Sequence, residues 1–78
     1  EAFPVEVNSA DRRSLLRVPG IGPTGAKRVM AARREVRLRE LGQLAALGVR
    51  TDACGPFVLL AGRRPPVQAR LPLVWWNA

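Results

Sequence analysis

The chain has 78 residues, in which 13 lysines and arginines stand against six acidic residues, so its formal net charge is +7. This length allows one small domain and little more, and no apolar run approaches the roughly 18 residues of a membrane-spanning helix. A single cysteine and the absence of histidine exclude an internal disulfide framework and argue against a zinc site. The chain starts at Glu1 and not at methionine, so we expect it to be a piece of a longer protein.

The beginning of the chain predicts an extended segment followed by a helix. Residues 1–7 contain Pro4 and alternate weakly between apolar and polar, which favours an extended lead-in. Asn8 and Ser9 are both good N-cap residues. We therefore expect a first helix over about 10–17.

The sequence VPGIGP, from Val18 to Pro23, predicts a tight turn between two helices. Gly20 and Gly22 permit backbone angles that a side chain would penalise. Pro23 suits the first turn of a new helix, because an N–H at that position would have no partner anyway. The pattern predicts a second helix over about 23–34, whose free N–H groups form a ready phosphate site.

Basic residues crowd around this turn. Between Arg12 and Arg39 the sequence holds nine basic residues and one acidic residue, Glu35, which is a local excess of +8. Such an excess attracts polyanions and supplies the salt-dependent part of nucleic-acid binding. A solvated arginine-rich surface is the alternative, so the charge supports a phosphate site without being independent proof.

The second half of the chain resembles a degenerate copy of the first half. A third helix is expected over about 39–47, with Gly48 placed to end it. Gly48-Val49-Arg50 then repeats the Gly-Ile-Gly of the first turn after 28 residues, with Arg50 in place of the second glycine. Self-similarity of this kind is typical of a duplicated unit.

In the copy, Cys54 stands in register with the small residue Ala26. A free cysteine commonly serves as a small buried hydrophobe, and the alternative is a reactive thiol, which would need an activating group nearby. Pro56 conflicts with an uninterrupted fourth helix. We expect that helix to begin near Gly55 and to end by Gly62.

The last part of the chain, residues 63–78, holds three prolines and no helical period, which predicts an irregular tail. Trp75 and Trp76 would expose much apolar surface there. They either dock on this domain or on the rest of the parent protein, or they serve base stacking or partner binding.

The first turn and its flanks resemble the helix-hairpin-helix motif, which binds the sugar-phosphate backbone of DNA without reading sequence. A plain helical hairpin with glycines that serve only the turn is the alternative. The resemblance implies backbone N–H contacts to phosphate and added charge from two basic side chains, and in this family a monovalent cation often sits on the hairpin carbonyls. The implied DNA-binding residues are Gly20, Ile21, Gly22, Thr24, Gly25, Lys27 and Arg28.

A wider resemblance covers about residues 3–62. The strings FPVEVNSAD and LLRVPGIG, the Ala-Arg-Arg of the second helix, Leu38, residues 41–49 and Phe57 are similar to the C-terminal end of DNA modification and repair proteins of the radical S-adenosylmethionine class. In bacteria these proteins occur with a uracil-DNA-glycosylase-like partner. The resemblance implies an accessory DNA-binding domain in the cytoplasm, whose partners are duplex DNA, the rest of the parent protein and such a glycosylase-like protein, with no membrane.

The catalytic part of that family lies upstream and holds an iron–sulfur cluster on three cysteines, a motif that this sequence lacks. We therefore expect no catalytic residue, no metal ligand and no cofactor in this segment, apart from a monovalent cation at the hairpin. Two alternatives remain. A competence-type extracellular DNA receptor shares the Asn-x-Ala lead-in and the Pro-Gly-Ile-Gly hairpin. Such receptors typically keep an intact apolar-Gly-Ile-Gly sequence in the second hairpin, where this chain has Arg50 in place of the second glycine. A degenerate unit can also serve as a protein-interaction or dimerisation module.

The sequence as a whole predicts an all-α fold: four short helices in two helix-hairpin-helix motifs, the second of them degenerate. The expected domain covers residues 8–62, between the lead-in 1–7 and the tail 63–78. Its core would consist of apolar and small residues on the inward helix faces. These are Leu15, Leu16, Val18, Ile21, Ala26, Val29, Met30, Leu38, Leu41, Leu44, Leu47, Val49, Cys54, Phe57 and Val58.

Overall fold

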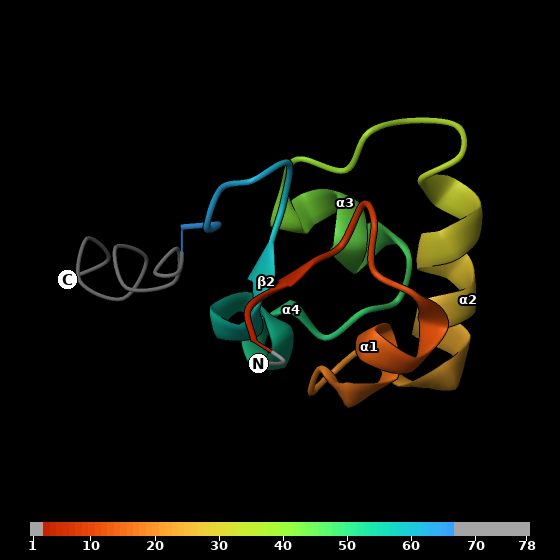
Figure 1. The fold of residues 1–78 in the computed structure, drawn as a ribbon, viewed down its shortest axis with the longest axis horizontal. Coiled ribbons are helices and arrows are strands. Elements are labelled where there is room, and N and C mark those ends of the chain that lie inside the picture. The colour runs from red at the N-terminus through yellow and green to blue at the C-terminus, as the bar shows by residue number, and fades with distance from the viewer. Residues whose placement is uncertain (1–2, 67–78) are drawn as a thin grey trace, which may run out of the picture.

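The computed structural model describes residues 3–66 (Figure 1), so the expectations for Trp75, Trp76 and the rest of 67–78 lie outside the described residues. Within 3–66 the chain forms four α-helices, one 3₁₀-helix and two short strands. In chain order they are β1 (Val5–Glu6), α1 (Arg12–Arg17), α2 (Gly22–Ala32), α3 (Leu41–Ala46), α4 (Thr51–Cys54), η1 (Gly55–Phe57) and β2 (Val58–Leu59). The fold is dominated by helices, as expected, but it is not built of helices alone.

A small parallel sheet joins the two ends of the described chain. Val5 of β1 is opposite Val58 of β2, and the N–H of Val7 donates to the carbonyl of Leu59 at 3.0 Å. All three valines are buried, and β-branched side chains of this kind pack well on a strand. The lead-in is therefore a part of the core, and the two strands lie side by side in the middle of the molecule (Figure 1).

The expectation for the fourth helix was wrong at both ends. Helix α4 begins at Thr51 and ends at Cys54, before the position where a helix was expected to start. Pro56 has no N–H to continue the α-helical pattern, so the chain passes into the 3₁₀-helix η1, which accepts proline near its start. The chain then becomes extended as β2, where a helix had been expected.

Helix α1 is capped by a residue other than the expected Asn8 or Ser9. The carboxylate of Asp11 accepts a hydrogen bond of 2.9 Å from the N–H of Ser14. The side chain of Asn8 instead pairs with the backbone of Leu38, donating to its carbonyl and accepting from its N–H, both at 2.8 Å. These two hydrogen bonds join the loop before α1 to the segment between α2 and α3.

Helices α2 and α3 lie where the sequence predicted them, with ends that differ by one or two residues. Helix α3 starts with a capping box, in which the side chain of Glu40 accepts from the backbone N–H of Gln43 and the side chain of Gln43 accepts from the backbone N–H of Glu40. The link before α3 is also fixed by Gln43, whose side-chain oxygen accepts from the N–H of Arg39 at 2.6 Å.

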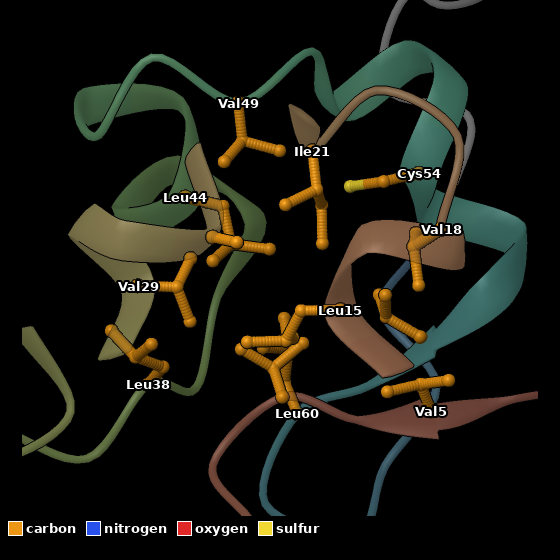
Figure 2. Close-up of a cluster of buried hydrophobic side chains, with 13 residues drawn as sticks. Val5, Leu15, Val18, Ile21, Val29, Leu38, Leu44, Val49, Cys54 and Leu60 are labelled. Carbon is orange, nitrogen blue, oxygen red and sulfur yellow. The ribbon is translucent and has the colours of Figure 1, made fainter. Parts of the chain in front are cut away.

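The core gathers side chains from every element (Figure 2). Leu16 does not belong to it, because 36% of this residue is exposed: the inward face of the short helix α1 is already taken by Leu15 and Val18. Val7 and Leu60 are buried but were not expected in the core. The buried apolar residues are Val5, Val7, Leu15, Val18, Ile21, Ala26, Val29, Leu38, Leu44, Val49, Cys54, Val58 and Leu60. Met30, Leu41, Leu47 and Phe57 pack against them while partly buried.

The described fold continues past Gly62, where the domain was expected to end. Leu60 and Arg63 form an antiparallel bridge, with hydrogen bonds of 2.8 and 3.1 Å in the two directions. Pro65 is buried. The bridge at Arg63 and the burial of Pro65 therefore extend the domain beyond its expected end.

Candidate functional site

The first turn, residues 18–21, links α1 to α2, and two glycines with positive φ angles lie in it and directly after it. Gly20 has a φ of +92° and Gly22, the first residue of α2, has +66°. Side chains rarely adopt such angles. The N–H of Ile21 donates to the carbonyl of Val18 at 3.2 Å and closes the turn. Both glycines thus adopt the backbone conformations that their positions in the sequence predicted.

The second turn, residues 47–50, links α3 to α4 and lies directly against the first. The N–H of Arg50 donates to the carbonyl of Gly20 at 3.1 Å, and a Cβ on Gly20 would lie 2.6 Å from the carbonyl oxygen of Arg50. Gly48 has a φ of +88°, close to that of Gly20. Arg50 has a φ of −82°, unlike Gly22, so this position does not require a glycine.

Two of the expected site residues are buried beneath the first turn. Ile21 is 4% exposed and lies beside Val49 in the core (Figure 2). Gly25 is buried as well, and a Cβ there would meet both Ile21 and Val49 at 3.4 Å. The packing of the Ile21 side chain and the close approach at Gly25 hold the two turns together, and neither residue reaches the surface.

Three other expected residues are exposed at the start of α2: Gly22, Thr24 and Lys27. The first N–H groups of a helix have no partner within the helix. The N-cap residue is Ile21, which has no side-chain oxygen to accept them, and no side-chain cap bond forms there. The N–H groups of Gly22 and Thr24 are therefore available to an anion at the positive end of an 11-residue helix.

Arg28 connects α2 to the second turn. Its Nη1 donates to the carbonyl of Leu47 at 3.4 Å, and it lies 3.1 Å from the position that a Cβ on Gly48 would take. The Arg28 side chain is exposed. Its charge thus stands at the junction of the two turns.

A groove next to the first turn was not foreseen. It has a volume of about 640 Å³ and combines α2 with the start of α1. The residues that line it are Arg12, Pro23, Thr24, Lys27, Met30, Ala31 and Arg34. The spacing of Thr24, Lys27, Ala31 and Arg34 would have placed them on one helix face, but the approach of Arg12 depends on how α1 packs.

Cys54 occupies the small-residue position that the internal repeat predicts. It is fully buried, and burial, assisted by the charge of Asp52, raises the pKa of the thiol to about 11. A thiol with so high a pKa stays protonated at neutral pH and is a poor nucleophile. The structure supports a packing role.

Within residues 3–66, no group of three or more histidine, cysteine, aspartate or glutamate side chains comes together as a metal site would require. No helix in the same range has the length and apolar character needed to cross a membrane. No family model, curated protein or solved structure matches the chain.

Proposed function

We propose that this domain binds duplex DNA without sequence preference, through a helix-hairpin-helix motif formed by α1, the first turn and α2. The observation that carries the proposal is the exposed start of α2, where the N–H groups of Gly22 and Thr24 have no side-chain cap. Lys27 lies one helical turn further on. The local excess of eight positive charges around the turn supports a polyanionic ligand.

In this proposal the exposed residues touch DNA and the buried ones shape the turn. Phosphate oxygens accept from the N–H groups of Gly22 and Thr24, and Gly22 lets the backbone approach closely because nothing else stands within 4 Å of its missing side chain. Lys27 and Arg28 add charge. Gly20, Ile21 and Gly25 act by holding the turn against Val49 and Arg50. Phosphate contacts position a protein without specifying sequence.

A monovalent cation on the turn carbonyls would share these oxygens with hydrogen bonds, because each carbonyl oxygen has two lone pairs. The carbonyl of Val18 already accepts from Ile21, and that of Gly20 accepts from Arg50. No part of the proposed DNA contact relies on a cation. We further propose that the domain is an accessory part of a larger cytoplasmic DNA repair or modification protein, in which the rest of the protein carries the chemistry.

Fluorescence anisotropy titrations with duplex and single-stranded oligonucleotides over a salt series test the proposal. If about four phosphates are neutralised, the slope of log affinity against log salt is expected near −3 to −4, with dissociation constants of roughly micromolar or weaker. Unrelated duplexes should bind equally and better than single strands. An affinity that ignores salt, or strong discrimination between duplexes, would contradict DNA-backbone binding.

A second candidate function is a protein-interaction or dimerisation module. Phe3 favours it, because this residue is 46% exposed while its ring contacts that of Phe57 in a tilted arrangement, with a centroid distance of 5.1 Å and an interplanar angle of 55°. Sedimentation analysis of the free protein tests this candidate. A monomer that binds DNA with the expected salt slope would favour the first function.

A further inference from the structure

The groove beside α2 continues from the proposed DNA contact toward the far end of the helix. It begins at Pro23 and Thr24, next to the exposed N–H groups, and extends to Arg34. Lys27 lies within α2, whereas Arg34 lies two residues beyond Ala32, the last residue of that helix. Arg12, at the start of α1, lines the same groove. Three cationic side chains, Arg12, Lys27 and Arg34, therefore line the groove next to the first turn.

These positive charges have no neutralising partner in the groove. The described residues that line it include no carboxylate. Asp11, next to Arg12 in the chain, is engaged as the cap of α1. Glu35 does not line the groove, but it lines an adjoining hollow that shares Arg34 with it and that holds two further arginines, Arg33 and Arg37. A groove whose charged side chains are all positive concentrates anions from solution.

Arg12 extends the row of cations onto α1. It is the first residue of that helix and follows the capping residue Asp11, and it lines the groove together with Lys27 and Arg34.

We infer that this groove is a second anion-binding site, which holds the phosphodiester backbone of a nucleic-acid strand beyond the turn. The inference rests on the proposed function, since the groove and the exposed start of α2 share Thr24 and Lys27. A row of phosphates matches a row of cations, whereas a single small anion would leave most of them unpaired. Pro23, Met30 and Ala31 provide apolar surface on which sugar rings can lie.

The chain offers two unique methyl probes for the test. Ile21 is its only isoleucine and lies under the first turn, and Met30 is its only methionine and lines the groove. Protein labelled with ¹³C at these two methyl groups is titrated with a blunt duplex and followed by NMR. Both signals are expected to move in the natural sequence.

Matched charge variants separate the groove from general electrostatics. In Arg12→Gln/Arg34→Gln the shift of the Met30 signal should fall at least twofold while Ile21 still responds, and the salt slope should become shallower by about 2. The control Arg39→Gln/Arg63→Gln removes the same charge from a different hollow. It should leave the Met30 response intact and change the slope by less than about 1.

Each other outcome decides between the inferences. A Met30 signal that stays still while Ile21 moves would overturn the groove site and leave the proposed function standing. If neither signal moves and anisotropy shows no binding, the proposed function fails as well. A poly-glutamate chain of equal charge that shifts Met30 as strongly as DNA at the same salt would overturn the nucleic-acid assignment in favour of an acidic protein partner.

Discussion

At the scale of single residues, Gly20 and Gly22 share a positive φ but differ in their surroundings. A side chain at Gly20 would meet the backbone of Arg50, whereas a side chain at Gly22 would meet nothing within 4 Å. We expect Gly22→Ala to lower the free energy of unfolding by about 1 to 2 kcal/mol, the cost of the left-handed backbone. Gly20→Ala should lose a further 1 to 3 kcal/mol, roughly, through overpacking.

Urea denaturation followed by circular dichroism measures both losses. Equal losses from the two substitutions would show that the second turn moves away readily and that the contact between Gly20 and Arg50 is soft.

Ala61 is the one described residue other than glycine with a positive φ, at +56°. Together with Gly62, at +80°, it forms a two-residue turn between the bridged residues Leu60 and Arg63, a turn that favours glycine or asparagine at its first position. Ala61→Gly should raise the free energy of unfolding by about 0.5 to 1 kcal/mol, because relief of strain exceeds the added entropy of the unfolded chain.

The matched control is Ala45→Gly on the exposed side of α3, where the same change should cost about 1 kcal/mol. Thermal melting of the two variants beside the natural sequence gives the comparison. A loss of stability in both would refute the assignment of strain to Ala61.

At the scale of elements, Glu6 fastens β1 to the turn that follows β2. Its carboxylate accepts from the N–H groups of Gly62 at 2.7 Å and Ala61 at 3.2 Å, and from the backbone and side chain of Asn8 at 3.1 and 3.0 Å. Partial burial raises the pKa of Glu6, but these hydrogen bonds together outweigh it and leave the pKa below its ordinary value. The ionised carboxylate is thus the form that the fold prefers.

A lowered pKa in the folded state makes Glu6 stabilising above the unfolded value of 4.5, and this contribution is lost as the pH falls through the folded value. We expect Glu6→Gln to melt at a lower temperature than the natural sequence at neutral pH. The difference should shrink below pH 4.5. Melting curves over a pH series check this, and a difference that stays constant down to pH 2.5 would exclude the role of the charge.

The two turns are expected to contribute unequally to DNA binding. Gly22→Arg blocks the exposed N–H groups, so it should weaken binding by more than about tenfold, or 1.4 kcal/mol, even though it adds a positive charge. The Arg50 side chain is 75% exposed and pairs only loosely with Asp52, at 3.7 Å. Arg50→Ala should therefore weaken binding by about threefold or less, no more than a single phosphate contact.

Anisotropy titrations of the two variants, after circular dichroism has shown that both are folded, make this comparison. Equal losses would mean that both turns engage DNA and that the second turn is not degenerate in function.

The sequence was informative about α1, α2 and α3 because glycine, proline and apolar spacing act locally. The sheet could not be read in the same way. Its strands have two residues each, too few to show a period, and they pair Val5 with Val58 across more than fifty residues. Pro56 was recognised as incompatible with a long fourth helix, but the alternative of a short α4 followed by η1 and β2 depends on that distant pairing.

The candidate site divides in the same way. Gly22, Thr24 and Lys27 follow from a local motif, and the structure places them together on the surface. The groove that joins Arg12 to Arg34 depends on the packing of α1 against α2, and no local pattern connects the two.

At the scale of the whole molecule, a net charge of +7 on 78 residues makes the domain repel itself. Screening of that repulsion should raise the melting temperature by several degrees between about 0.02 and 0.2 M sodium chloride, since a small domain gains roughly 4–8 °C per kcal/mol. The same salt should weaken DNA binding. Melting and anisotropy measured in one salt series check the opposite signs, and a melting temperature that falls with salt would show that attraction outweighs repulsion in the fold.

The bond between the two turns is made by main-chain atoms, the N–H of Arg50 and the carbonyl of Gly20. This hydrogen bond therefore permits any residue at position 50 except proline, which has no N–H. Position 20 is restricted to glycine, because a side chain there would collide with the backbone of Arg50. The side chain at position 50 is thus free to vary while the framework under the first turn stays the same. One member of the internal repeat can diverge in chemistry as long as the other keeps its shape.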